Sequence, residues 1–140
     1  MPSVETKIWL ALKSRVESLP LTLVKAWPGQ PFKAPTSGNT LPPYLRIGRV
    51  TVDPVRQFLD FGKPHERTGA LIITLVYPLG PDIAVFDNLA GTIAAHFADG
   101  TQVRYDDVCV LVPNYPYVNE GYEDNGYWAV PISIPWRCYA

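Results

Sequence analysis

The chain has 140 residues, of which 47% are hydrophobic, 12% aromatic and 18% charged, and its formal net charge is −1. This length and composition predict one globular domain, residues 1–140, and the 15 prolines fall between periodic segments or at particular strand positions rather than in a disordered tract. No apolar run approaches about 20 residues, and the N-terminus lacks the basic-then-apolar order of a signal peptide, so we expect neither a membrane-spanning helix nor signal-directed export.

The N-terminal part predicts one helix and two strands separated by loops. Apolar residues recur at helical spacing over 4–18, Ser3 is a suitable N-cap, and Pro20 ends the helix. We expect strands at 21–27 and 44–52. The intervening segment, 28–43, holds five prolines and two glycines and predicts a surface loop, and a second long loop follows at 53–66. Loops of this length are usually functional or flexible.

The middle of the chain predicts a buried strand and a second helix. Residues 70–77 are apolar on both faces apart from Thr74, which is typical of a central strand covered on both faces, or on one face and by an interface. Pro81 at the first helical position and Asp82 near the positive end of the dipole start the helix. Its predicted buried stripe consists of Phe86, Leu89, Ala90, Ile93, Ala94 and Phe97.

The C-terminal part predicts strands at 103–105, 108–112 and 127–138. In the last of these, apolar residues alternate on one face from Trp128 to Trp136. Pro131 and Pro135 share the other parity, so both missing N–H donors face one side. This predicts an edge strand whose outer side cannot extend a sheet, which would suit a protein that halts a polymer. Between the strands lies an acidic, tyrosine-rich hairpin, residues 114–126, which we name the acidic arm.

The order of these elements predicts the fold class. A helix, three strands, a helix and two or three further strands indicate an α+β fold. We expect a mostly antiparallel sheet of four to six strands, with two helices packed on one face and with long loops and the arm projecting from it.

The sequence predicts no catalytic, cofactor-binding or metal site. His65 and His96 are each isolated from other side chains at metal-ligand spacing. Asp106 and Asp107 are adjacent, which is typical of a solvated turn rather than of a carboxylate pair. The glycines form no phosphate-binding pattern.

The two cysteines, Cys109 and Cys138, form no spaced motif, so we expect free thiols in a reducing compartment. Cys109 lies in an alternating apolar strand without an activating context, where cysteine behaves as a small hydrophobe.

The charges are divided along the sequence. Residues 1–67 carry ten Lys/Arg and five Asp/Glu, formally +5, and residues 68–140 carry two Lys/Arg and eight Asp/Glu, formally −6. Complementary potentials steer contacts between proteins, so a divided surface suits binding to copies of itself or to an oppositely charged partner. The candidate interface residues are Arg46, Arg49, Arg56, Lys63 and Arg67 on the basic side, and Tyr117, Glu120, Tyr122, Glu123 and Asp124 in the acidic arm.

Simpler interpretations of these two groups stay open. The basic residues could form a solvated positive surface, a contact with an acidic protein or a phosphate site for nucleic acid. The arm could be an ordinary solvated hairpin or an interface rim with aromatic anchors.

Several segments together resemble the phage tail terminator family. They are VETKIWLALKSRVESLPLTLVKAWPGQPFKAP, PYLRIGRV, ERTGALIITLVYPLG, IAAHF, YDDVCVLV and GYEDNGYWAVPISIPWRC. They cover most of the chain and leave mainly residues 53–66 unmatched. The family has no motif of functional residues, so the resemblance assigns no role to any single position.

The resemblance implies a structural virion protein of the tail, assembled in the host cytoplasm, and not an enzyme. Tail terminators form a hexameric ring on the last ring of the tail tube, stop tube growth and present the surface that joins the head. The implied partners are further copies of the chain, the tail tube protein and a head–tail connector protein. DNA only passes through the channel, and no membrane or cofactor is involved.

These expectations combine into a hypothesis about assembly. The loops at 28–43 and 53–66 would meet the acidic arm of the next subunit, or the tube below. Two alternatives stay open at this point. The chain could be a standalone binding module for an acidic protein or a nucleic acid, or a small enzyme that uses Cys109 or the acidic arm.

Overall fold

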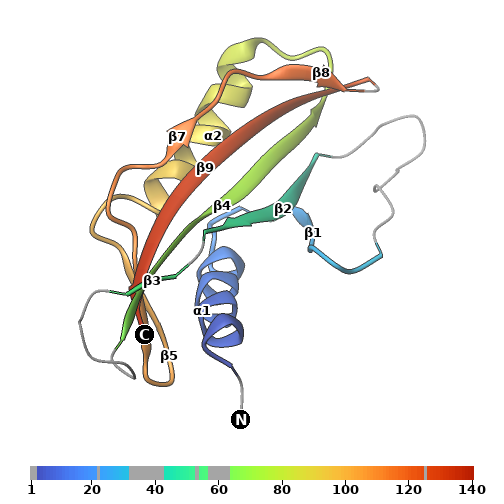
Figure 1. Ribbon diagram of the computed structural model, residues 1–140. Helices are drawn as coiled ribbons and strands as arrows, with labels where there is room; N and C mark the ends of the chain where they lie inside the picture. Colours follow the sequence, from blue (N-terminus) through green and yellow to red (C-terminus); the bar gives the residue numbers. More distant parts are fainter. Residues whose placement is uncertain (1–2, 22, 32–42, 53, 57–63, 125) are drawn as a thin grey trace.

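A computed structural model describes residues 3–21, 23–31, 43–52, 54–56, 64–124 and 126–140 of the chain. Its elements are α1 (Val4–Glu17), β1 (Val24–Ala26), β2 (Tyr44–Thr51), β3 (Val55–Arg56), β4 (His65–Pro78), α2 (Ile83–His96), β5 (Gln102–Tyr105), β6 (Val108–Leu111), β7 (Tyr117–Val118), β8 (Tyr122–Asp124) and β9 (Tyr127–Tyr139). The α+β class is confirmed (Figure 1). Neither helix of the described chain is long and apolar enough to cross a bilayer.

Both predicted helices are confirmed. The Ser3 side chain caps α1 by accepting a hydrogen bond of 3.2 Å from the Thr6 N–H. Asp82 caps α2 by accepting 2.9 Å from the Ala84 N–H, so Pro81 precedes the cap instead of opening the helix. A side-chain oxygen at the N-cap satisfies a backbone donor that has no partner within the helix. The predicted stripe of α2 faces the core, although Leu89 is only half-buried.

The sheet is larger than predicted, with nine strands in the described chain instead of four to six. Its main order is β1-β2-β4-β9-β6-β5, while β3 pairs with β4, and β7 and β8 pair with β9. All pairs are antiparallel except β1 with β2. In Figure 1 the long strands β4 and β9 run side by side along the molecule as its curved spine.

β9 lies in the middle of this sheet, so the prediction that it forms an edge is wrong. β4 pairs along one side of it from Tyr127 to Tyr139, and β6, β7 and β8 cover parts of the other side. The Pro131 carbonyl accepts a hydrogen bond from the Asn119 N–H at 2.9 Å, so this residue faces the β7 side. N–H and C=O of one residue in an antiparallel strand point the same way, and the missing donor faces that side too.

The two prolines explain why the neighbours of β9 are short. Pro131 falls between the partners of β8 and those of β7, and Pro135 falls between the partners of β7 and that of β6. A proline cannot donate to the ladder, so each one interrupts pairing. Pro131 and Pro135 share one parity of β9, as the sequence indicated. The side that they face is bordered by three short strands, β8, β7 and β6, and is not an open edge.

Both helices pack on one face of the sheet, as predicted, and share one core. The strands contribute Leu45, Ile47, Leu71, Ile73, Leu75, Val130, Ile132 and Ile134 to it, and the helices contribute Ile8, Leu12, Val16, Phe86, Ile93 and Phe97. The register aligns these strand residues in rows across β2, β4 and β9. We call this side the helix face and the side without helices the open face.

Some predicted boundaries are wrong. β1 occupies only Val24–Ala26 of the predicted strand 21–27. The predicted loop 53–66 contains β3 and the start of β4, because β4 begins at His65 instead of residue 70 and pairs with β3 and β9 there. Residues 32–42 of the first loop and 53 and 57–63 of the second lie outside the described residues.

Candidate interface surfaces

The basic candidates lie on different surfaces. Arg46 projects from the open face of β2, whereas Arg49 and Arg67 lie on the helix face, since alternate residues of a strand point to opposite sides. Arg56 is exposed on β3, beside the first residues of β4. Lys63 lies outside the described residues. Their role in an interface stays a prediction.

Arg46 already contacts the acidic arm of its own chain. Its Nη2 lies 3.7 Å from Asp124 Oδ2 and 3.4 Å from the hydroxyl of Tyr44. The ring of Tyr44 also packs edge-on against Tyr127, with 5.8 Å between centroids. Both partners of the ion pair are partly exposed, so the pair adds little stability, about 0–1 kcal/mol. The contact places Asp124, near the C-terminal end of the acidic arm, beside Arg46 of β2.

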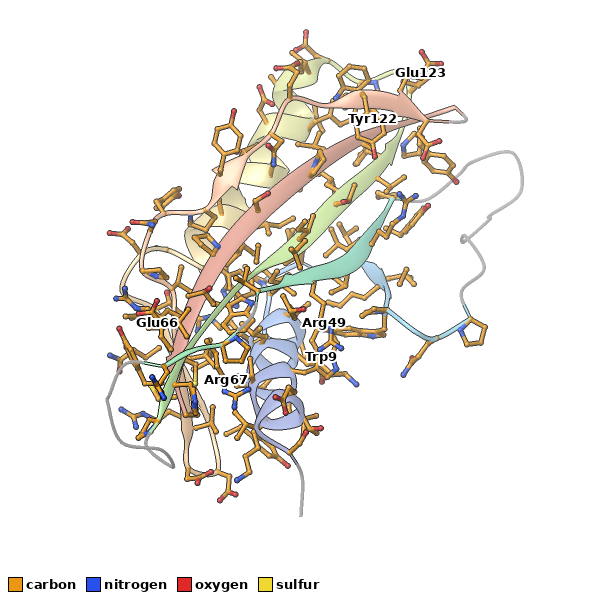
Figure 2. The ribbon with its side chains drawn as sticks, in the orientation of Figure 1. Trp9, Arg49, Glu66, Arg67, Tyr122 and Glu123 are labelled. Atoms are coloured by element: carbon orange, nitrogen blue, oxygen red, sulfur yellow. The ribbon has the colours of Figure 1, made fainter. Side chains whose placement is uncertain are left out.

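A pocket of about 240 Å³ lies on the helix face between α1, β2 and β4. We name it the Trp9 pocket; its main lining residues are Ile8, Trp9, Leu12, Arg49, Arg67 and Trp136. Figure 2 shows Trp9 and Arg49 together beside α1, with Arg67 further along β4. Trp136 is 6% exposed, and its indole N–H has no hydrogen-bond partner among the described residues. Apolar walls with a few convergent polar groups are typical of binding sites.

The pocket carries one positive charge in excess. Arg67 Nη1 lies 2.6 Å from Glu5 Oε1, so these two charges offset each other. A backbone hydrogen bond at Glu5 and then the Arg67 guanidinium lower the pKa of the Glu5 carboxyl, so it stays ionised in this pair. Arg49 lies with its guanidinium carbon 5.4 Å from the centroid of the Trp9 ring and has no carboxylate partner among the described residues. An exposed cation over an indole stays available to an anion.

Hydrogen bonds at Asn119 and close packing at Gly121 hold the acidic arm against β9. The Asn119 side chain donates to the Pro131 carbonyl at 3.1 Å and to Ser133 Oγ at 3.0 Å. At Gly121 the backbone touches the Trp128 indole so closely that a Cβ would collide with it. The arm is therefore an ordered surface feature despite its short strands.

The arm presents its candidate side chains at the free edge of the sheet. Tyr117 is 66% exposed and Tyr122 is 46% exposed. Glu120 and Glu123 are exposed and have no ion pair within the described chain. Figure 2 places Tyr122 and Glu123 at one end of the molecule, well away from Trp9 and Arg49.

The turn at Asp106 and Asp107 is more than a solvated turn. Asp106 has a positive φ of 55°, and both carboxylates approach Lys7 Nζ, at 3.1 and 2.6 Å. Hydrogen bonds from Lys7 lower the pKa of Asp107, and the two carboxylates raise the pKa of Lys7. This contact ties the start of α1 to the β5–β6 hairpin. The sequence did not reveal it, because the partners are 100 positions apart.

The described chain contains no group of three or more His, Cys, Asp or Glu side chains that could hold a metal ion. Cys109 and Cys138 are both free thiols, and burial raises the pKa of Cys138. His65 lies in β4, where its backbone pairs with Ala140. His96 lies at the end of α2 and contacts α1, as described below.

Comparison with known proteins gives one family and one fold. The profile of a family described as phage tail terminator protein matches residues 7–136. The chain belongs to the phage tail terminator family. A protein of solved structure is similar in fold, with a TM-score of 0.70, 19% sequence identity, and coverage of 94% of this chain and 92% of that chain. No protein with a curated description matches the sequence significantly.

Family membership gives the general role. Tail terminator proteins are structural components of phage tails, so this chain is a structural virion protein of the tail. That role is consistent with the expectation that it is not an enzyme. The resemblance noted from the sequence segments is confirmed, because the match spans both helices and the central strands.

Proposed function

We propose that this tail terminator protein caps the tail tube as a homo-hexameric ring, stops tube polymerisation and presents the surface that joins the head. The observation that carries the proposal is the family match over residues 7–136. In the proposed assembly, residues 1–140 act as one domain, the ring contacts the tube protein and the head–tail connector protein, and DNA passes through the channel. Assembly takes place in the host cytoplasm, without a cofactor and without a membrane.

The charge distribution supports the ring. A ring requires a heterologous interface, in which two different surfaces of each copy meet, and closes when the rotation between copies closes. Opposite formal charges on the two parts of the chain, +5 over residues 1–67 and −6 over 68–140, suit such an interface. The hypothesis that the loops at 28–43 and 53–66 contact the next copy's acidic arm, or the tube, remains part of the proposal.

The way in which growth is stopped needs another argument, since β9 is central and does not present a blocked edge. We propose that the ring stops growth by covering the last ring of tube protein with a surface that accepts no further tube subunit.

Removal of the protein during phage production tests this function. Without it, we expect tubes of uncontrolled length and heads without joined tails, because nothing ends polymerisation or offers the joining surface. Electron microscopy measures the tube lengths and the fraction of joined heads, and expression of the wild-type chain in trans is the control. Tails of normal length joined to heads in the absence of the protein would overturn the proposal.

The basic candidates give a second test. Replacing Arg49 and Arg56 together by Glu should prevent ring formation or capping, because like charges would then face each other. A double variant that assembles and complements like the wild type would remove both residues from the proposed interface.

A further inference from the structure

We propose that the Trp9 pocket receives the edge of the acidic arm of a second copy of this chain, with Glu123 of one copy pairing with Arg49 of the next. The inference rests on the proposed ring and names the two surfaces that meet in it. The pocket lining and residues 117–124 of the arm lie among the described residues, and of the loops at 28–43 and 53–66 only Pro54 lines the pocket.

The pocket has the properties of a receptor for an acidic side chain next to an aromatic one. Its apolar walls are Ile8, Trp9, Leu12 and Trp136, and Arg49 supplies a cation without a carboxylate partner in the described chain. Its volume of about 240 Å³ suits one or two side chains, since pockets for drug-sized ligands hold about 300–1,000 Å³.

The indole N–H of Trp136 is an unpaired polar group beside this pocket. Buried donors nearly always have a hydrogen-bond partner in folded proteins. This one has none among the described residues, although the residue lines the pocket. The nitrogen is itself buried, so it lies beneath the pocket surface and is not a docking contact.

The acidic arm has the complementary properties. Glu123 is an exposed carboxylate with no ion pair in the described chain, and Tyr122 beside it is an exposed aromatic side chain. Within the part of the chain that the structure describes, β8 pairs with β9 and with no other strand, so its second edge is open to a partner. The hydrogen bonds of Asn119 and the close packing of Gly121 hold the arm in place, which reduces the entropy lost on binding.

A chain cannot place its own arm in its own pocket. Figure 2 shows Tyr122 and Glu123 at one end of the molecule and Trp9 and Arg49 in the other half. The contact must therefore join two copies through different surfaces, which leaves one pocket and one arm free on every open assembly until it closes.

Charge exchange tests the contact. Arg49→Glu puts an acidic pocket against an acidic arm, and Glu123→Arg puts a basic arm against a basic pocket. We expect each variant alone to associate about 100-fold more weakly than the wild type, because like charges in an interface are strongly unfavourable. An equal mixture of the two restores both contacts and should give rings in which the variants alternate.

Native mass spectrometry over a dilution series distinguishes these species by mass, and circular dichroism establishes that each variant folds. Arg104→Glu and Asp87→Arg, at exposed positions outside both surfaces, are the matched controls and should associate normally. Tyr122→Ala should weaken association. When both charge variants carry it, mixing them should still restore rings.

The possible failures are separable. If both single variants still form rings as the wild type does, this contact is overturned and the proposed function stands. The same holds if the single variants lose the ring and the mixture does not recover it. A wild-type chain that stays monomeric, alone and with tail tubes, would contradict the ring itself and this contact with it.

Discussion

The absence of a side chain at Gly69 makes room for Trp136, which lines the Trp9 pocket. A Cβ at this residue of β4 would lie 2.7 Å from Cζ2 of Trp136 and would also collide with the Val50 carbonyl. Trp136 therefore packs directly over the backbone. This contact could not be predicted, because it joins residues on β2, β4 and β9 whose register only the folded sheet defines.

Substitution of this glycine should destabilise the fold. We expect Gly69→Ala to lower the free energy of unfolding by about 1–3 kcal/mol, since overpacking forces the backbone or the indole to move. Urea unfolding measures the change. Gly91→Ala is the matched control, because nothing lies within 4 Å of a Cβ there, and alanine inside α2 should stabilise by roughly 0.5–1 kcal/mol. Equal effects of the two substitutions would contradict this explanation of Gly69.

At the scale of elements, α1 and α2 are joined at their C-terminal ends by reciprocal hydrogen bonds. The Arg15 guanidinium donates to the His96 carbonyl at 2.6 and 3.1 Å, and His96 Nε2 donates to the Arg15 carbonyl at 3.0 Å. Burial, together with the nearby Arg15 charge, lowers the pKa of His96 below its ordinary 6.5. The neutral imidazole is the form that the folded chain prefers.

The pH dependence of stability follows from this shift. Between the lowered folded pKa and about 6.5, the unfolded chain binds more protons at His96 than the folded chain does. The stabilisation that neutral His96 contributes to the fold is therefore complete above about pH 6.5 and is lost as the pH falls from there through the lowered folded pKa. His96→Gln, which retains a donor for Arg15 but does not titrate, should lack this loss. Thermal unfolding of both proteins between about pH 7.5 and 5.5 measures the difference; parallel curves would contradict it.

The helices were predictable because their signals are local. Ser3, Asp82 and the apolar stripes determine where α1 and α2 begin and which side is buried. The alternation in β9 likewise identified its buried face. Its place in the sheet was not predictable, because Pro131 and Pro135 constrain one side of the strand whether that side is open or borders interrupted strands.

At the scale of the whole molecule, the candidate site was only partly predictable. The sequence indicated that basic and acidic groups are separated, and it named Arg49 and Glu123 among the candidate interface residues, which stays a prediction. It did not indicate that Arg46 pairs with Asp124 within the chain, or that Trp9 and Trp136 line a pocket together with Arg49. Those facts depend on a sheet that aligns β2, β4 and β9 and on the position of α1 against it.

This arrangement gives one copy two unlike surfaces, Tyr122 and Glu123 of the acidic arm at one end and an apolar pocket with an excess positive charge in the other half. Contacts between unlike surfaces propagate in one direction and close into a ring only at a suitable rotation. The family role, the charge division and the two surfaces therefore support the same assembly.

Electron cryomicroscopy of tail ends tests this assembly most directly. We expect six copies of the chain at one end of each tail tube, with the acidic arm of every copy against the Trp9 pocket of its neighbour. Copies distributed along the tube, an end without the chain, or a ring in which Arg49 and Glu123 both face solvent would contradict it.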